Sequence, residues 1–348
     1  MASGAAPLSF PRPVISAAFL DRKVVRDQRS GNLVEGQCLV SVASGNVYLL
    51  VRTLRECIYG KVKHAIRIVD VGNGVYEYGR EYVAIKVMFK RKIQELRGRH
   101  NEDPIKEIAA MQFLSTAPEG VEGTKQGEGE STHQGGHPNV LPLLECVQDE
   151  DLVYCVMPYC GAELFSFVEQ QGAFLEDRAR QYFREILCGT NYLHSRGVCH
   201  RDLSLENVLV SQNTCIIIDM GMCLRMPVDQ TTGKHLLINP QGQCGKRNYM
   251  SPEIFLNKRP FSGEAIDFWA CGIILFIMLT GVPPFETATE VDPRFQMISS
   301  WRLSEMLSLW EINLSPEAVD LLSRMLRPNP QERLKYEEIM AHPWMNLS

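Results

Sequence analysis

The chain has 348 residues, of which 45% are hydrophobic and 22% charged, and its formal net charge is −5. This composition is ordinary for a soluble globular protein with one large domain or two lobes, and the acidic balance argues against a nucleic-acid binder. The eleven cysteines include no CxxC pair, which predicts reduced thiols in a cytoplasmic or nuclear compartment. We expect no membrane span, because the longest apolar run, 269–285, is short, contains two glycines and ends in Pro-Pro.

The first part of the chain is predicted to be an extension followed by strands. Residues 1–46 are punctuated by Pro, Gly and Ser, so we predict a partly disordered N-terminal extension. Asn73-Gly74 predicts a hairpin, because a tight primed turn needs positive φ at its central residues. β-branched and apolar residues predict strands at 46–56, 61–69 and 81–89.

The chain then changes from strands to helices. Residues 103–115 predict a helix, since Asp103 can cap it and Pro104 suits its first position. Residues 116–136 are a low-complexity insert that cannot build a core. Strands are predicted at 139–147 and 152–159, and helices at 164–170, 176–196, 263–281, 302–309 and 316–326. Strands with one helix, followed mainly by helices, predict an α+β class with two lobes.

Several polar side chains among apolar runs have the spacing that phosphoryl transfer requires. Lys86 ends the strand sequence VAIK, and Glu107 on the following helix can pair with it. In HRDLSLEN, Asp202 can act as the base and Asn207 as a metal ligand, while Asp219 in DMG offers a second ligand. A cation for the phosphates, oxygens for Mg²⁺ and a carboxylate for the attacking hydroxyl are the parts that this reaction needs. Each residue alone is ordinary, so the prediction rests on their occurrence together.

Further motifs follow in the order typical of one family. SPE (251–253) and DFWACG (267–272) come after the residues above, and Arg333 in PQERL can pair with Glu253. AHPWM lies near the end of the sequence. With these motifs the sequence resembles a eukaryotic protein kinase of the Ser/Thr type, similar to the calmodulin-dependent kinases, over residues 47–346.

The resemblance implies a protein kinase fold and activity. The N-lobe would span about 47–157, mainly antiparallel strands with one main helix, and the mainly helical C-lobe about 158–346. The enzyme would use ATP and Mg²⁺, phosphorylate Ser or Thr of protein substrates, and work as a monomeric catalytic domain. Three alternatives stay open: a dual-specificity or tyrosine kinase, a pseudokinase scaffold and a small-molecule phosphotransferase. The intact catalytic residues argue against a pseudokinase, and Glu253 and Asp267 argue against a small-molecule substrate.

The resemblance also implies the nucleotide site. The phosphate lid falls on 55–62, with Gly60 as its third glycine and Arg55 and Cys57 in place of the first two, which predicts a stiffer or more open lid. Glu163 resembles an acidic residue that contacts the ribose and can select a basic residue upstream of the target hydroxyl. The implied nucleotide-binding residues are Gly60, Val62, Ala84, Lys86, Glu107, Met157, Pro158, Cys160, Glu163, Glu206, Leu209 and Asp219, and the implied Mg²⁺ ligands are Asn207 and Asp219.

Two positions depart from the family pattern in opposite senses. Ser204 stands where Ser/Thr kinases have a lysine that touches the γ-phosphate; tyrosine kinases have no lysine at this position. Lys246 stands where the family has a threonine that packs against that lysine. An ammonium on a flexible stem can serve from either side. We therefore predict that Lys246 is a catalytic residue that supplies the missing charge.

Activation is left with two alternatives. In the family an arginine such as Arg201 can grip a phosphorylated residue of the activation segment, but the usual phosphate position falls on Gly242, which has no hydroxyl. The available hydroxyls are those of Thr231 and Thr232. Either the segment is ordered without phosphate, or one of these threonines is modified.

Overall fold

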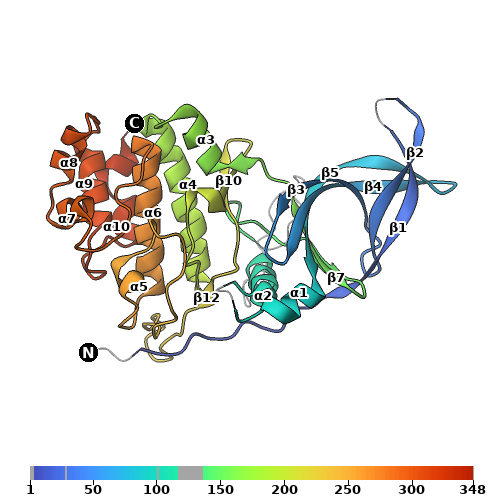
Figure 1. The fold of residues 1–348 in the computed structure, drawn as a ribbon, viewed down its shortest axis with the longest axis horizontal. Coiled ribbons are helices and arrows are strands. Elements are labelled where there is room, and N and C mark those ends of the chain that lie inside the picture. The colour runs from blue at the N-terminus through green and yellow to red at the C-terminus, as the bar shows by residue number, and fades with distance from the viewer. Residues whose placement is uncertain (1–3, 28–29, 100–101, 117–135, 348) are drawn as a thin grey trace. The chain divides into compact units, whose positions relative to one another are not determined.

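The fold is described from a computed structural model, which covers residues 4–27, 30–99, 102–116 and 136–347 (Figure 1). The chain divides into two compact units: a barrel unit of Pro11–Gly136 and Leu141–Cys160, and a helical unit of the remaining residues, which include Phe10 and those before it. One unit is mainly antiparallel strands and the other mainly helices, which confirms the predicted α+β, two-lobed class. The predicted insert, 116–136, lies almost entirely outside the described residues.

The barrel unit is a closed barrel with strand order β1-β2-β3-β4-β5-β7-β6. The predicted hairpin at Asn73-Gly74 joins β4 to β5, and both residues have positive φ, 54° and 72°. Helix α2 begins at Pro104 after Asp103, whose carboxylate accepts hydrogen bonds from two backbone N–H groups, as expected. The elements are β1 (Ser16–Arg26), β2 (Leu33–Ser41), β3 (Val47–Glu56), β4 (Gly60–Gly72), β5 (Val75–Phe89), α1 (Lys90–Leu96), α2 (Pro104–Ser115), β6 (Glu145–Gln148) and β7 (Leu152–Pro158).

The N-terminal residues differ from the predicted extension, because β1 and β2 lie within residues 1–46 and help to close the barrel. β1 pairs with β2 along its length, and also in parallel with β5 and β6. Only Ala18 and Val25 of β1 are fully buried, and charged residues separate them. β1 is therefore held mainly by backbone hydrogen bonds to its neighbouring strands. Its sequence shows little of the alternation of apolar and polar residues that predicts a strand.

Apolar side chains fill the barrel. At one end of it, Glu145 joins three segments through hydrogen bonds. The carboxylate of Glu145 on β6 accepts hydrogen bonds from Ser41 Oγ at 2.8 Å, Ser44 Oγ at 3.0 Å and Asn46 Nδ2 at 3.1 Å, and also from the Tyr48 hydroxyl. These donors come from the end of β2, the following turn and the start of β3. The barrel core is Ala18, Leu39, Tyr48, Ala65, Val83, Ile85, Val87, Val147, Tyr154 and Val156.

The helical unit is built around α6 (Gly263–Thr280). This helix is long and apolar enough to cross a membrane, but 83% of it is buried inside the protein, as predicted for a core helix. Ser262 caps its N-terminus by accepting from Ala265 N, and Gly281 ends it at φ 77°. The other elements are β8 (Ala162–Glu163), α3 (Leu164–Gln171), α4 (Glu176–Ser195), β9 (Val198–Cys199), η1 (Leu205–Asn207), β10 (Val208–Ser211), β11 (Thr214–Ile217), β12 (Leu224–Arg225), α5 (Pro252–Leu256), α7 (Pro293–Ser299), α8 (Leu303–Leu309), α9 (Pro316–Met325), α10 (Tyr336–Met340) and η2 (Pro343–Asn346).

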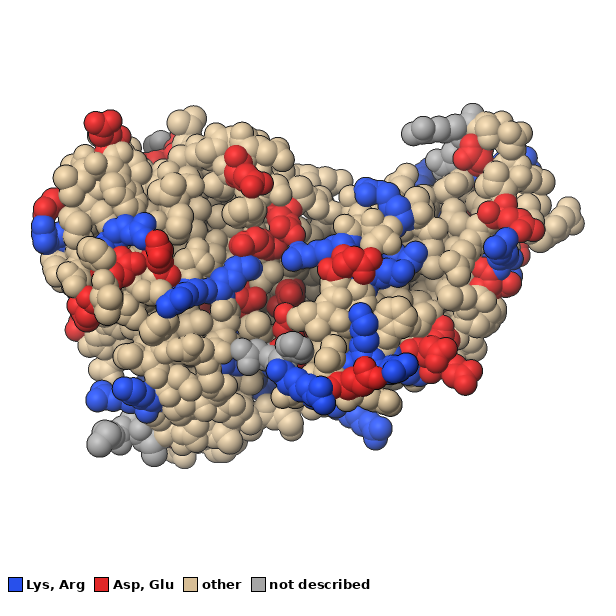
Figure 2. All heavy atoms as spheres, in the orientation of Figure 1, with Lys and Arg blue, Asp and Glu red and all other residues tan. Residues whose placement is uncertain are grey.

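Charged side chains of both signs are interspersed on the face drawn in Figure 2. The basic run at 86–100, predicted to be mostly a solvated face, forms the end of β5 and then α1 as far as it is described. Of the seven residues of α1, only Ile93 is buried. The rest of this short helix is thus exposed or partly exposed, as the sequence indicated.

Replacing Glu145 with Ala should destabilise the protein, because four donors lose their acceptor. We expect the free energy of unfolding to fall by about 1–3 kcal/mol, measured by urea denaturation. Glu150→Ala, at an exposed position on the turn after β6, is the matched control and should change it by less than about 0.5 kcal/mol. Equal losses in the two variants would contradict this role of Glu145.

Candidate active site

Asp267 on α6 holds the loop that carries the candidate catalytic residues. Its side chain is 1% exposed. One carboxylate oxygen accepts from His200 N at 2.8 Å, and the other accepts from Arg201 N at 2.9 Å. His194 Nε2 on α4 lies 2.9 Å from the first of these oxygens. A buried carboxylate is tolerated only when its oxygens are paired in this way, so the backbone before Asp202 is fixed to the central helix.

His200 connects this loop to the segment that contains Asp219. Its Nδ1 accepts from Asp202 N at 3.2 Å, so its Nε2 carries the hydrogen that Ile218 O accepts at 2.9 Å. Ile218 N in turn donates to Asn207 O at 3.0 Å. Asp219 then adopts φ 68°, a conformation that non-glycine residues rarely take and that occurs at functional sites.

Asp202 and Asn207 share a hydrogen bond that leaves the Asn207 side-chain oxygen for a cation. Asn207 Nδ2 donates to Asp202 Oδ2 at 2.9 Å and to Asp202 O at 2.8 Å. Burial raises the pKa of Asp202 above its ordinary value, and nearby Lys246 and His200 oppose that shift. With its nitrogen committed, Asn207 offers an amide oxygen, and Asp219 offers a carboxylate. Oxygen donors of these types suit Mg²⁺, so the residues present fit the ion.

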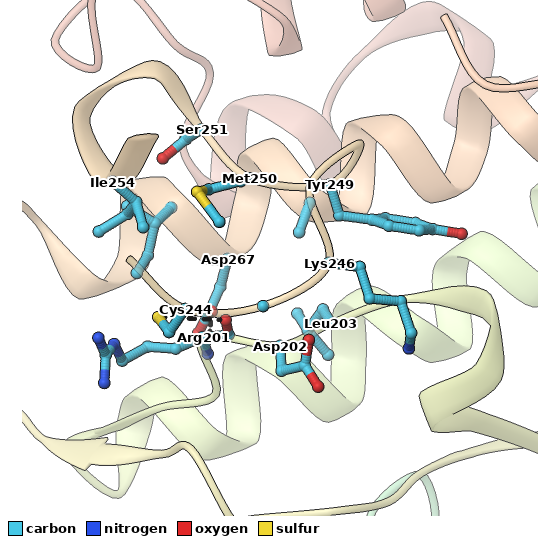
Figure 3. A pocket seen from close by; sticks show the side chains of 13 residues that line it. Arg201, Asp202, Leu203, Cys244, Lys246, Tyr249, Met250, Ser251, Ile254 and Asp267 are labelled. Carbon is cyan, nitrogen blue, oxygen red and sulfur yellow. Dashed lines mark hydrogen bonds between the residues drawn. The ribbon is translucent and has the colours of Figure 1, made fainter. Parts of the chain in front are cut away.

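Lys246 reaches Ser204, the position where the family's lysine is missing. Its Nζ donates to Ser204 Oγ at 2.6 Å and lies 3.6 Å from Glu206 Oε2. Gly245 makes this approach possible: its φ is 83°, and a Cβ there would lie 2.9 Å from Arg201 O. Figure 3 shows Lys246 and Asp202 pointing the same way from their two segments. The ammonium is therefore not turned to solvent alone, since Ser204 itself is fully buried.

Lys86 and Glu107 form the predicted ion pair within the barrel unit. Lys86 Nζ lies 2.6 Å from both carboxylate oxygens of Glu107, and the two side chains are 17% and 11% exposed. The helix start explains the position of Glu107, because the Asp103 cap places it in the first turn of α2. The same start is held by Arg97, whose guanidinium pairs with Asp103 at 3.0 Å.

The predicted lid is a tight turn in which Gly60 has a packing role that the sequence did not reveal. Cys57 N donates to Gly60 O and Gly60 N donates to Cys57 O, at 2.8 and 3.2 Å. A Cβ at Gly60 would lie 1.9 Å from Val87 O, so only glycine fits beside β5. Tyr59 is buried and donates to Glu102 O at 3.0 Å, near the start of α2.

The remaining predicted nucleotide-binding residues fall on elements of both units, which are described separately. In the barrel unit, Ala84 pairs with Met157, and burial raises the pKa of the Cys160 thiol to about 11. In the helical unit, Glu163 on β8 pairs with Leu209 on β10. Val62 lies on β4, Pro158 ends β7 and Glu206 lies on η1.

The activation segment, residues 219–253, ends at a buried ion pair. Arg333 donates to both oxygens of Glu253, at 2.6 and 2.7 Å, as the motif predicted. Earlier in the segment, Thr231 and Thr232 lie exposed in a turn whose backbone N–H groups donate to Asp229. Arg201 donates to Met222 O at 3.3 Å, while its Nε and Nη2 have no partner among the described residues.

Comparison with known proteins agrees with this geometry. The sequence model of the protein kinase domain family matches residues 119–345. CBL-interacting protein kinase 1 of Oryza sativa subsp. japonica is 32% identical over 312 residues, which are 89% of this chain and 58% of that protein. CBL-interacting serine/threonine-protein kinase 3 of Arabidopsis thaliana is 31% identical, covering 85% of this chain and 58% of that protein. Sucrose non-fermenting protein kinase 1 of Fusarium virguliforme is 30% identical over 85% of this chain and 36% of its own length.

The chain therefore belongs to the protein kinase domain family, which confirms the resemblance and the fold class predicted from the sequence. Members of this family transfer phosphoryl groups from ATP to proteins. The chain spans less than two thirds of the length of the curated relatives above.

Two residues of the site received no role from the sequence. His200 fixes the backbone of Asp202, and Gly245 lets the next residue approach Ser204. A histidine beside a catalytic Arg-Asp pair, and a glycine beside a displaced lysine, were the signals available. Neither signal states which atoms the residue would contact.

Glu253→Ala should destabilise the helical unit strongly, because it leaves the guanidinium of Arg333 buried without its carboxylate. We expect a loss of about 3–5 kcal/mol in the free energy of unfolding, measured by urea denaturation. Glu337→Ala in the first turn of α10 is the control and should cost much less, because the side chain there is exposed. A loss of under about 1 kcal/mol for Glu253→Ala would count against the anchoring role.

Proposed function

We propose that this chain is an ATP- and Mg²⁺-dependent protein kinase that phosphorylates Ser and Thr hydroxyls of protein substrates. The observation that carries the proposal is the set of contacts in the loop of Asp202: a fixed backbone, an Asn207 amide that holds the Asp202 carboxylate, and a lysine ammonium hydrogen-bonded to Ser204. The relatives named above include a protein described as a serine/threonine-protein kinase. The ion pair of Lys86 with Glu107 adds a phosphate-binding cation on the barrel unit.

Each proposed role follows from the atoms that a side chain presents. ATP supplies the γ-phosphoryl group when bound, and Mg²⁺ neutralises the charge of its phosphates. Asp202 orients the substrate hydroxyl and accepts its proton. Lys86 holds phosphate oxygens, while Asn207 and Asp219 would hold Mg²⁺ through their side-chain oxygens. The buried backbone anchor at Asp267 keeps Asp202 in one orientation before any substrate arrives.

Lys246 is proposed to supply the positive charge that other Ser/Thr kinases place at the position of Ser204. The hydrogen bond from Lys246 Nζ to Ser204 Oγ, at 2.6 Å, supports this, since it brings an ammonium next to the side chain that stands in the place of the missing lysine. The absence of lysine at 204 alone favoured a dual-specificity or tyrosine kinase. An ammonium beside Ser204 weakens that argument, and the intact candidate catalytic residues count against a pseudokinase.

Substrate choice and compartment complete the proposal. Glu163 lies partly buried at the start of α3 and is proposed to contact the ribose and to favour a basic residue upstream of the target hydroxyl. A peptide-array assay would show whether such residues are preferred. None of the eleven cysteines, all of which are described, forms a disulfide, and most are buried, which supports work in a reducing cytoplasmic or nuclear compartment.

Asp202→Asn should remove most of the transfer, because the amide cannot accept the hydroxyl proton. We expect kcat on a protein substrate to fall by about 10²- to 10⁴-fold, while ATP binding measured by titration calorimetry is retained. Asp151→Asn, on an exposed turn of the barrel unit, is the control and should keep full activity. Near-normal turnover of Asp202→Asn would rule out the proposed base.

A double-mutant cycle tests the displaced lysine. Lys246→Thr should lower kcat by about 10²-fold or more with a smaller effect on the Kd for ATP, as for loss of one preorganised charge contact. Ser204→Lys alone should be neutral or harmful, since two ammonium groups would crowd one site. The double variant should recover much of the lost rate, so the two changes are strongly coupled. Additive effects, with Lys246→Thr nearly silent, would show that Lys246 has no catalytic role.

A further inference from the structure

The first described residues of the chain lie against the activation segment. Ala5 N donates to Leu237 O at 2.8 Å, and Asn239 N donates to Ala5 O at 2.9 Å. These two hydrogen bonds form a parallel bridge between Ala5 and Ile238. Figure 1 traces the N-terminal segment in dark blue. The backbone of the N-terminal segment thus forms hydrogen bonds with the backbone of the activation segment on both sides of Ile238.

A second contact lies three residues further along the same segment. Leu8 N donates to Arg225 O at 3.0 Å in an antiparallel bridge, and Arg225 Nη1 donates to Ser9 O at 3.0 Å. Arg225 belongs to β12, which pairs on its other side with β9, directly before the catalytic loop. Pro7, which has no N–H to offer, falls between the two bridges, where no ladder bond is needed.

The activation segment is therefore held from two sides at Ile238. Ile238 is fully buried, and it exchanges two hydrogen bonds with Phe261, at 2.8 and 2.9 Å, on the side away from Ala5. Beneath it lies an apolar cluster of Cys199, Met226, Ile238, Cys244, Met250, Ile254, Phe261 and Ile266. Ile238 consequently lies between two isolated β-bridges, one to Ala5 and one to Phe261.

The fit of the N-terminal segment is close. A Cβ at Gly4 would lie 2.5 Å from Asn239 Oδ1 and 2.7 Å from Pro260 Cβ, so a larger residue would have to displace the segment. Ala6, two residues on, is exposed. Position 4 thus has room only for glycine, whereas position 6 has room for a larger side chain. A segment that lay loosely on the surface would not show this difference.

We propose that Gly4–Ser9 is an intramolecular strap, which holds the activation segment in its active conformation without a phosphate. This proposal rests on the proposed kinase function, since it assigns a role to the activation segment. Gly242 has no hydroxyl at the usual phosphate position, and Arg201, which would grip a phosphate, instead donates to Met222 O and lies over the Phe261 ring. The strap supplies the order that phosphorylation supplies elsewhere, through backbone hydrogen bonds to Arg225, Leu237 and Asn239.

Hydrogen exchange of the 348-residue chain tests the strap independently of catalysis. Gly4→Val should speed exchange of the Asn239 amide by about 3- to 10-fold, because its acceptor on Ala5 is displaced. Ala6→Val is the matched control and should leave that rate unchanged. Leu8→Pro removes the donor to Arg225 O, and Leu8→Ala keeps it, which gives a second matched pair. Unchanged exchange over residues 236–240 in both Gly4→Val and Leu8→Pro would overturn the proposal.

Kinase assays on the same preparations test the consequence. Unphosphorylated protein with Thr231→Ala and Thr232→Ala should keep full activity, while adding Gly4→Val should lower kcat/KM for a protein substrate by about 10-fold, with the Kd for ATP unchanged. Loss of activity in the double-threonine variant alone would overturn the proposal, because a phosphate would then be required. Faster exchange with undiminished activity would overturn it as well. If the unmodified protein transfers no phosphate, the proposed function fails, and the exchange data still decide whether the strap exists.

Discussion

The buried carboxylate of Asp267 is the constraint on which the rest of the helical unit depends. Two of its hydrogen bonds end on consecutive backbone N–H groups, at His200 and Arg201, so the backbone immediately before Asp202 has one allowed position. Arg201 itself adopts φ 69°, a strained conformation that these bonds maintain. Because a buried carboxylate without donors is costly, any movement of the catalytic loop away from α6 would carry that penalty.

The activation segment is ordered by packing and backbone pairing at several places along its length. Its start is tied to the catalytic loop through Ile218, and its end is fixed by Glu253 and Arg333. Between them, backbone pairs and an apolar cluster hold residues near Ile238. Because these contacts already order the segment in the folded chain, a ligand that bound to it would cause little further loss of conformational entropy.

Lys246 places an ammonium beside Ser204, the position where the family's lysine is missing. Lys246 and Ser204 are 42 residues apart, yet Gly245 allows their backbones to come close enough for a direct hydrogen bond. The flexible lysine stem tolerates attachment at either segment, whereas a short or rigid side chain would not. In the barrel unit, β1 and β2 lie outside the region of clear family resemblance, yet they are the strands that complete the closed barrel.

The sequence by itself determined the candidate catalytic side chains and the longer helices and strands after residue 46. Lys86, Asp202 and Asp219 could be found because motif spacing is local, and helices such as α4 and α6 because their periodicity and caps are local too. Only the tertiary structure decided that β1 and β2 close a barrel and that Gly4–Ser9 pairs with the activation segment. The physical reason is that both features consist of contacts between residues far apart in the chain, made largely by backbone groups that every residue carries, so no local pattern of side chains encodes them.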